Sequence, residues 1–591
     1  MAAKSKAKPR GESDTGPQLF ADLPPASRQK FLVALQAVTI VLGAFAVFSP
    51  VLRDTWYGDD ALYITGNPLL RMPGRLAKAW LEPGSFIDYY PLEQTVQYLQ
   101  WCLFGQDSPF YYLLCNLALH AASALLLWRL FARLGLRYAW LGGLLFAIHP
   151  LLVDSVGNAT ELKNTLSLPP LLLALCAWLD FDRTRAPRDY ALGLYLVSML
   201  CKITAYFLPI VLLLYAWWKR GKITWADCRA AAPFFAVSLA LSLLQIHAGA
   251  VYAGATHYVS PGPIHLGGLG ERLELAGLSL AFYFGHAVLP VPIMPYYPQW
   301  PLDPLSPLGF LPWIGIALVL AACWIRRRAW GRPVLFALAF FLLGLAPFLG
   351  FNQVSYMCLY WVSDHLLYLP IIALIGLAVA GVEGLAAQIP ARLHTMGAGL
   401  LALIVLLLGA QTHSYATLFA GQEQLWRDNL RHNPGSWMLH DLLGTELATQ
   451  QQLPEAIAEL RESLRLNPRF DNAEMTLGLC LFKTGDFKGA IAAFRRCLEL
   501  NPRYHAAQLF LGFVLARDGQ LDAAIAQFRA FLRGLPTSAQ AHMGLGQTLA
   551  MQGHIPEAIA ELQTALQLDP TNQEIPAQIA ALQSRETAPP K

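Results

Sequence analysis

The sequence predicts an all-α protein in two parts, a polytopic membrane domain followed by a helical solenoid. Of the 591 residues, 55% are hydrophobic, 12% aromatic and only 14% charged, and apolar stretches follow one another up to about residue 413. Beyond that point the chain becomes polar and repeats with a fixed period. Long apolar stretches are typical of membrane helices, and a fixed period is typical of solenoids. The net charge of +4 is small for this length and gives a nucleic-acid role no electrostatic support.

The first apolar stretch, residues 31–52, is long enough to cross a bilayer core, which takes about 20 residues. It follows a basic, polar tail, residues 1–30, which begins MAAKSKAKPRGESD and has no evident small-residue cleavage site. We therefore interpret the stretch as an uncleaved signal anchor whose tail lies in the cytoplasm.

The remaining membrane domain, to residue 415, contains eleven further apolar stretches. These are 109–133, 138–150, 162–180, 190–201, 203–218, 229–250, 273–292, 308–325, 334–350, 366–386 and 394–413. Basic clusters after several of them mark the cytoplasmic side. All of these clusters lie on that side only if 273–292 does not cross the membrane. The Pro-rich, nearly uncharged segment that follows 273–292 is typical of a re-entrant or interfacial stretch. This leaves about eleven crossings. The long loop 53–108 and everything after about Gln411 are then expected on the outer side.

The C-terminal part carries a repeat of 34 residues. The period is marked by Pro434, Pro468, Pro502, Pro536 and Pro570, by Gly444, Gly478, Gly512 and Gly546, and by Ala456, Ala490, Ala524 and Ala558. This pattern predicts four tetratricopeptide repeats over residues 437–585, preceded by a linker helix over 416–436. Each repeat is expected to be a helix pair with Gly and Ala at the helix crossing and Leu in the core. The array would bind an extended peptide or a partner protein, or serve only as a structural cap.

Polar residues beside membrane segments are costly, so each is a candidate functional residue. Asp59 and Asp60, in WYGDDALY, follow the first crossing, and the Trp-Tyr pair before them is typical of a membrane interface. The alternative is a pair of turn formers. Asp88 lies in the same outer loop.

Three further groups lie at predicted outer helix ends. AIHPLLVDSVGNATELKNTLS holds His149, Asp154, Glu161 and Lys163 within fifteen positions, which suggests a polar cavity rather than a solvated loop. Lys202, in SMLCKITAYFLP, either snorkels to the surface or holds a phosphate. The stretch YWVSDHLLYLP contributes Asp364, His365 and Tyr368.

Carboxylates and cations on the outer side predict a reaction there. The sequence has no nucleotide-phosphate loop, nucleophile elbow or zinc-protease helix, and soluble nucleotide sugars are not expected outside the cytoplasm. A lipid-linked phosphate is the most compatible substrate, because its tail can occupy lipid and its phosphate can lie against Lys202 or His365. A divalent cation is the one cofactor that the sequence leaves open.

The chain resembles a known family along most of its length after residue 30. The matching stretches are WYGDDALYITGNPLL, DYYPLEQTVQYLQWCLFG, YYLLCNLALHAASALLL, HPLLVDSVGNATELKNTLSL, CKITAYFLPIVLLLY, SDHLLYLP and EQLWRDNLRHNPGSWMLHDLLG. They are similar to the transmembrane and tetratricopeptide-repeat protein O-mannosyltransferases and their bacterial relatives, polytopic glycosyltransferases of the C-type fold. The resemblance implies a bacterial inner-membrane enzyme with a periplasmic repeat domain and a polyprenyl-phosphate sugar as donor, mannose or another hexose.

The resemblance also implies roles for individual residues. The acidic pair Asp59 and Asp60 would supply the catalytic base, with Asp59 preferred. Basic residues at the outer helix ends would receive the donor phosphate, namely Lys163, Lys202 and His365. The site would be lined by Asp88, His149, Asp154, Glu161, Asp364 and Tyr368. His365 stands where the family commonly has an Arg, and Lys202 is followed by Ile instead of the common Glu.

Two rival interpretations remain open at this point. The first keeps the chemistry but replaces the Ser or Thr hydroxyl of a protein acceptor with that of a lipid or glycan. The second is a non-catalytic membrane scaffold, in which the repeats assemble an export or envelope-polysaccharide machine and the acidic pair is an ordinary part of a loop.

Overall fold

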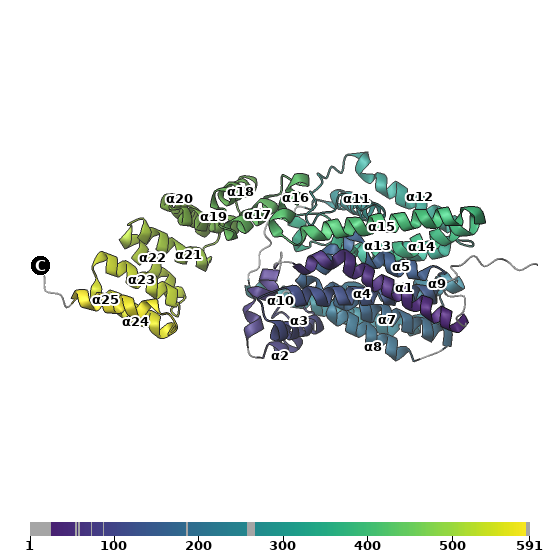
Figure 1. The fold of residues 1–591 in the computed structure, drawn as a ribbon, viewed down its shortest axis with the longest axis horizontal. Helices are drawn as coiled ribbons and strands as arrows, with labels where there is room; N and C mark the ends of the chain where they lie inside the picture. Colours follow the sequence, from purple (N-terminus) through teal and green to yellow (C-terminus); the bar gives the residue numbers. More distant parts are fainter. Residues whose placement is uncertain are drawn as a thin grey trace, which may run out of the picture.

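A computed structural model describes residues 25–53, 56, 60–72, 74–86, 88–184, 187–256 and 266–586. Over these residues the chain forms helices and no strand, as the sequence predicts. A bundle of long helices makes up the larger part of the molecule, and a curved array of short helix pairs extends from one end of it (Figure 1). We refer to these two parts as the bundle and the repeat array.

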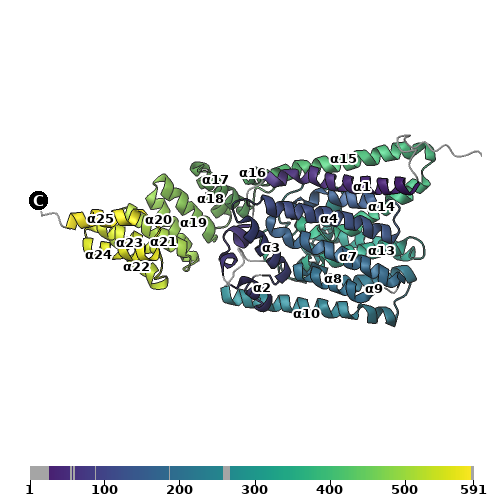
Figure 2. The same cartoon turned by 60° about the horizontal axis from the view of Figure 1, so that its bottom comes forward.

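The bundle contains long helices that run roughly along one direction, and the short helices α2 (Arg75–Leu81) and α3 (Pro91–Phe104) lie at the end nearest the repeat array (Figure 1). The longer helices are α1 (Pro25–Phe48), α4 (Phe110–Leu134), α7 (Leu162–Thr184), α10 (Trp225–Thr256), α11 (Leu269–Val288), α12 (Leu311–Ile325), α13 (Gly331–Leu345), α14 (Ile371–Gln388) and α15 (His394–Leu418). The shorter helices are α2 (Arg75–Leu81), α3 (Pro91–Phe104), α5 (Ala139–Ala147), α6 (Val153–Gly157), α8 (Arg188–Cys201) and α9 (Leu208–Arg220). Figure 2 shows α1 and α15 side by side along one edge and α10 along the opposite edge.

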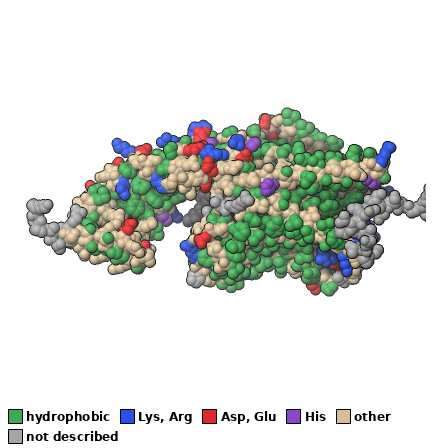
Figure 3. Space-filling model, viewed as in Figure 1, with side chains coloured by type: hydrophobic (Ala, Val, Ile, Leu, Met, Phe, Trp, Pro, Cys, Tyr) green, Lys and Arg blue, Asp and Glu red, His purple; other side chains and the backbone are tan. Residues whose placement is uncertain are grey.

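Eight helical segments of the described residues are long and apolar enough to cross a membrane, and the bent pair α5 and α6 would make a ninth. Hydrophobic side chains cover much of the visible face of the bundle, whereas charged side chains gather over the repeat array and the ends of the bundle (Figure 3). This distribution is the one expected of a membrane domain.

The count of about eleven crossings stays a prediction. Three of the predicted stretches fall on α5, α8 and α9, which have 9, 14 and 13 residues. At a rise of about 1.5 Å per residue, the longest of these spans about 21 Å, less than the roughly 30 Å of a bilayer core. The stretch predicted not to cross coincides with α11, which is not among the eight candidates in the described part of the chain.

Glycines allow the helices α4 and α5 to approach closely. A Cβ atom on Gly143 would lie 2.7 Å from the carbonyl oxygen of Ala124, and one on Gly142 would lie 2.4 Å from the ring of Phe131. Small residues at such crossings are typical of membrane helix packing, because no side chain then separates the two backbones.

The repeat array consists of four helix pairs and a final helix. Its helices are α17 (Trp437–Thr449), α18 (Leu453–Leu466), α19 (Asp471–Thr484), α20 (Phe487–Leu500), α21 (His505–Arg517), α22 (Leu521–Gly534), α23 (Ala539–Gln552), α24 (Ile555–Leu568) and α25 (Glu574–Glu586). A Cβ atom on Gly478 would lie 2.6 Å from the ring of Phe494 in the partner helix, and the other three repeat glycines are as confined. Leu443, Leu477, Leu511 and Leu545 are buried. The predicted roles of Gly and Leu in the helix pairs are confirmed.

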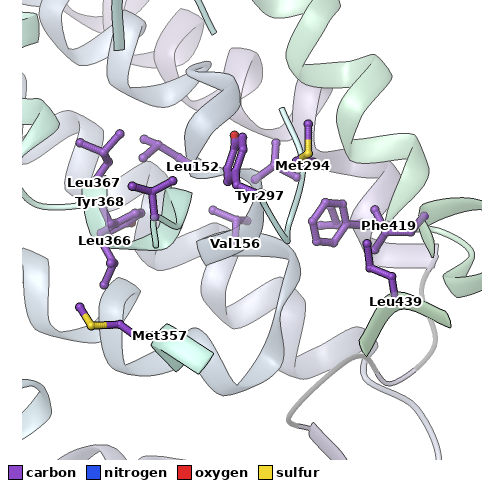
Figure 4. Close-up of a cluster of buried hydrophobic side chains, with 14 of the residues drawn as sticks. Leu152, Val156, Met294, Tyr297, Met357, Leu366, Leu367, Tyr368, Phe419 and Leu439 are labelled. Atoms are coloured by element: carbon purple, nitrogen blue, oxygen red, sulfur yellow. The ribbon is translucent and has the colours of Figure 1, made fainter. Parts of the chain in front are cut away.

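The helix α16 (Gln422–His432) connects the repeat array to the bundle. The side-chain amide of Asn429 accepts a hydrogen bond from the backbone N–H of Tyr296 and donates one to its carbonyl oxygen, at 3.1 and 3.0 Å. Buried apolar side chains continue from the bundle into the first repeat, from Leu152 and Val156 through Phe419 to Leu439 (Figure 4). The repeat array is therefore packed against the bundle.

Candidate functional site

Helix breaks bring the predicted polar residues together at the end of the bundle nearest the repeat array. The long helices are interrupted at 148–161, at Lys202 to Tyr206, and at 346–370, where short 3₁₀ turns, irregular chain and the five-residue helix α6 replace them. Non-helical backbone at membrane depth is tolerated only where protein surrounds it or where it lines a cavity. These three breaks therefore mark the place where polar groups can be held inside the bundle.

The centre of the site is Glu161 with two lysines. Lys163 Nζ lies 3.5 Å from Glu161 Oε1, and Lys202 Nζ lies 3.6 Å from Glu161 Oε2. Asn164 accepts a hydrogen bond of 2.6 Å from Lys202 and donates one of 2.5 Å to Glu161. One carboxylate thus faces two ammonium groups directly, while Asp88 and Glu93 of the outer loop lie within electrostatic reach of Lys163.

A second cluster forms around His365. Its Nδ1 lies 3.2 Å from Asp154 Oδ2 and 2.8 Å from the hydroxyl oxygen of Ser363. An Asp that accepts a hydrogen bond from Nδ1 orients the ring and leaves Nε2 available to a ligand. His365 can therefore hold an anion or move a proton.

Asn164 joins the two clusters. Besides its bonds to Lys202 and Glu161, its amide nitrogen lies 3.3 Å from the hydroxyl of Ser155 and 3.4 Å from the backbone carbonyl of His365. Five predicted site residues share this environment: Asp154, Glu161, Lys163, Lys202 and His365. The sequence analysis missed Asn164. Its position in the first turn of α7, three residues after Glu161, was a signal that the two side chains face the same side.

Asp60 lies at the edge of this site and is almost fully buried, with 2% of its surface exposed. Its Oδ1 accepts a hydrogen bond of 3.1 Å from the backbone N–H of Thr160, the residue before Glu161. The loop is also held from the other side, because the amide of Gln422 on α16 donates to the carbonyl of Trp56. Asp59, the preferred catalytic base, lies outside the described residues.

The remaining predicted residues contact protein groups at the periphery. Asp88 accepts a 3.1 Å hydrogen bond from Gln245 on α10. Both oxygens of Asp364 accept from the hydroxyl of Tyr297, at 2.9 and 3.1 Å. These contacts position the outer loop and the third helix break rather than pointing to a ligand.

His149 and Tyr368 are also held by protein groups. His149 accepts from the N–H of Leu151 and lies 3.3 Å from the carbonyl of Ala287, so its ring is neutral with a proton on Nε2. The hydroxyl of Tyr368 lies 3.1 Å from Nδ1 of His120. That His149 and Tyr368 line the candidate site stays a prediction.

Two buried ionisable residues of the outer loop escaped the sequence analysis. Glu93 on α3 has 7% of its surface exposed, and burial raises its pKa to about 7, although the nearby Lys163 opposes this shift. Arg75 on α2 has 3% exposed, and burial lowers its pKa to about 10. Their positions within the two helices of the outer loop were the signal by which the sequence could have indicated them. In the structure they extend the charged cluster beyond Glu161.

The described residues contain no group of three or more His, Cys, Asp or Glu side chains arranged to hold a metal ion. What the site can do is bind a phosphate through Lys163, Lys202 and His365, beside the carboxylates of the outer loop. Charge-assisted hydrogen bonds of this kind are the strong ones in a buried site.

Comparisons with known proteins concern the repeat array. Residues 442–505, 481–539 and 511–573 match the tetratricopeptide-repeat family profile. Such repeats generally mediate protein–protein interactions. No curated protein sequence matches the chain.

Solved structures of repeat proteins are similar to the same fraction of the chain. YrrB, described as a tetratricopeptide-repeat protein with an unusual peptide-binding site, is 24% identical and matches 28% of this chain and 81% of its own, with a TM-score of 0.25. MamA from Desulfovibrio magneticus RS-1 is 23% identical and matches 25% of this chain and 85% of its own, with a TM-score of 0.25. A thermophilic repeat protein from Thermus thermophilus is 21% identical and matches 30% of this chain and 96% of its own, with a TM-score of 0.24.

Proposed function

We propose that this protein is a membrane glycosyltransferase that transfers a sugar from a polyprenyl-phosphate donor to Ser or Thr hydroxyls of proteins on the outer side of the membrane. The observation that supports the proposal is the cluster of Lys163, Lys202 and His365 at one end of the bundle. Three groups that can carry positive charge, separated only by Glu161 and Asp154, fit the phosphate of a membrane-embedded donor better than a neutral substrate.

The reaction would be a single displacement. A carboxylate of the outer loop, for which Asp59 is preferred, takes the proton from the acceptor hydroxyl as its oxygen attacks the anomeric carbon. The bond from that carbon to the phosphate oxygen breaks on the opposite face, so the configuration inverts. The negative charge that develops on the departing polyprenyl phosphate is stabilised by the lysines and His365.

The burial of Asp60 supports different roles for the two acidic residues, with Asp60 as a positioning group and Asp59 as the base. Its bond to the N–H of Thr160 uses one of its oxygens to hold the loop beside Glu161. A carboxylate engaged in this way is a better positioning group than a base, which supports Asp59 as the proton acceptor.

The repeat array would recruit the acceptor. It is joined to the bundle through α16, whose Gln422 contacts the backbone of Trp56 in the loop that carries the acidic pair. A protein bound by the repeats is thereby kept close to the proposed site, which raises its effective concentration there.

The proposal is tested with the full-length protein in membranes, a polyprenyl-phosphate hexose and an acceptor protein. Base catalysis is typically worth 10²–10⁴-fold, so Asp59→Asn should leave less than about a tenth of wild-type transfer with donor binding intact. Mass spectrometry of envelope proteins then separates the rival interpretations. Loss of a hexose from Ser or Thr peptides supports a protein acceptor, a changed glycolipid profile supports a lipid or glycan acceptor, and no change in either supports a scaffold.

A further inference from the structure

The bundle also contains a cavity whose walls carry no charged side chain. It has a volume of about 190 Å³ and is enclosed by α4, α7, α9, α13 and α14. Its walls are almost entirely apolar and include Phe131, Leu172, Trp218, Phe336 and Ile372. A cavity of about 150 Å³ with such walls stays dry and takes a hydrocarbon ligand. We call this cavity the apolar slot.

The apolar slot runs along α14 from the buried Leu369 to the exposed Ala380. From Ile372 to Ala380 it follows α14 over a rise of about 12 Å, at about 1.5 Å per residue. The open end also includes Gly135, which follows α4, and Trp218 near the end of α9. These helix ends lie at the end of the bundle opposite the repeat array (Figure 1). The apolar slot therefore opens toward the other membrane surface from the proposed catalytic site.

Two cations flank the open end. Lys219 follows Trp218 and its Nζ lies 4.0 Å from that ring. Arg332 precedes Pro333, which lines the slot, and its guanidinium packs beside Gly221 at the end of α9. Within the part of the chain that the structure describes, neither cation has a carboxylate partner, and the Nε of Arg332 is buried with no hydrogen bond.

Two neighbouring arginines, Arg220 and Arg133, differ from Lys219 and Arg332 because each has a carboxylate partner. Arg220 contacts Asp182 at 2.7 Å and Asp227 at 2.5 Å, and Arg133 contacts Asp180 at 2.7 Å. Carboxylates thus neutralise Arg220 and Arg133, whereas Lys219 and Arg332, like Arg183, contact none among the described residues. An apolar slot with unneutralised cations at its mouth matches a ligand with a hydrocarbon chain and an anionic head group.

We propose that the apolar slot binds one acyl chain of an anionic phospholipid, with the lipid phosphate between Lys219 and Arg332. Basic pockets between membrane helices bind anionic head groups, and each Lys or Arg near such a surface contributes binding. A zwitterionic lipid brings its own cation and gains less from this pair. The proposal does not rest on the proposed catalytic function, because the open end and its two cations lie at the end of the bundle opposite the repeat array.

The test is native mass spectrometry of the full-length protein in detergent, with phosphatidylglycerol or phosphatidylcholine of the same acyl chains. We expect phosphatidylglycerol to remain bound in preference. Lys219→Gln and Arg332→Gln should each lower its occupancy about fivefold. Arg392→Gln removes an exposed charge from the turn between α14 and α15 and should change nothing.

Occupation of the slot itself is tested by narrowing it. Ala380→Phe places a ring at the exposed mouth, and Ala337→Leu fills the interior, so each should lower the binding of both lipids. Elution and thermal unfolding without added lipid show whether either variant misfolds. Equal binding of the two lipids, or an equal loss in Arg392→Gln, would overturn the proposal. So would displacement of phosphatidylglycerol by polyprenyl phosphate, which would assign the slot to the donor chain.

Discussion

The carboxylate of Asp60 and the backbone N–H of Thr160 are joined by a hydrogen bond of 3.1 Å across 100 residues of chain. This bond fastens the loop after the first helix to the turn that leads into α7. The same turn carries Glu161, so the position of the loop and the position of the charged cluster depend on each other.

This bond predicts different results for two substitutions of Asp60. Asp60→Asn keeps an oxygen that can accept from Thr160 and should preserve the loop. Asp60→Leu leaves that N–H to Asn158 Oδ1, at 3.0 Å, and removes a hydrogen bond between loop and turn that is worth about 0.5–1.5 kcal/mol. Hydrogen exchange of residues 60–72 measures the loop, and Asp107→Asn, an exposed carboxylate of the same loop, is the matched control. Equal exchange in Asp60→Leu and the wild type would show that the bond does not hold the loop.

The second prediction concerns the ion cluster around Glu161. Glu161→Gln should lower stability by about 3–5 kcal/mol, because it removes the carboxylate that both Lys163 and Lys202 face and leaves two buried ammonium groups without it. The double variant Lys202→Met with Glu161→Gln should recover part of this loss, because only Lys163 then lacks that carboxylate, and it should not recover donor binding. Thermal unfolding in detergent measures stability, and Lys222→Met, an exposed lysine, serves as control. No recovery in the double variant would mean that the two side chains are not energetically coupled.

A third prediction separates the charge of His365 from its shape. His365→Gln keeps a hydrogen-bonding group but cannot become cationic, and a hydrogen bond to a charged group is worth about 1.5–3 kcal/mol. The KM for a polyprenyl-phosphate sugar should therefore rise at least about tenfold, and His365→Arg should lower it again. Asp154→Asn should act in the same direction as His365→Gln, because Asp154 orients the ring. An unchanged KM in His365→Gln and Asp154→Asn would remove His365 from the donor site.

The repeat array was predictable from the sequence because its signal is local and periodic. Each of the glycines Gly444, Gly478, Gly512 and Gly546 meets the partner helix of its own pair, so the contact that explains the residue lies within one 34-residue repeat. The bundle helices were predictable as apolar stretches for the same reason. Some of their ends were not. The stretch 334–350 contains α13 only to Leu345, and the stretch 366–386 contains α14 only from Ile371, because short 3₁₀ turns occupy the chain between these two helices.

The candidate site was predictable as a set of residues but not as a geometry. Glu161 and Lys202 were each conspicuous as charges beside apolar stretches, and nothing local indicates that they meet at 3.6 Å. Asn164 was passed over because a neutral amide on a helix has many structural uses. Glu93 was passed over because a carboxylate in a loop is ordinarily solvated, and only packing against other helices makes it buried.

The last prediction concerns the first repeat, where two neighbouring residues have shifted pKa values. Burial raises the pKa of Asp441 to about 7, although Asn472 opposes this. Burial lowers the pKa of His440, but hydrogen bonds to Glu459 Oε2 at 2.6 Å and to the carbonyl of Pro434 at 3.1 Å raise it overall above 6.5. Both raised values have the same consequence, because the folded repeat binds protons more tightly than the unfolded chain does.

The stability contributed by Asp441 is present below its unfolded pKa of about 3.9 and is lost as the pH rises through about 7. That of His440 is present below about 6.5 and is lost as the pH rises through its higher folded value. Hydrogen exchange of α17 and α18 in the full-length protein, corrected for intrinsic rates, should therefore show greater protection at pH 5.5 than at pH 8. Asp441→Asn should raise protection at pH 8 and flatten the profile.

The fourth repeat provides an internal control. His542 makes the same contacts, to Glu561 at 2.6 Å and to the carbonyl of Pro536 at 3.0 Å, but the residue after it is Met543 instead of an acid. The pH dependence of α23 and α24 should be weaker than that of α17 and α18, because no acid of the fourth repeat stands where Asp441 does. Equal slopes in the two repeats, or a slope in the first repeat that survives Asp441→Asn, would mean that this carboxyl does not titrate with folding.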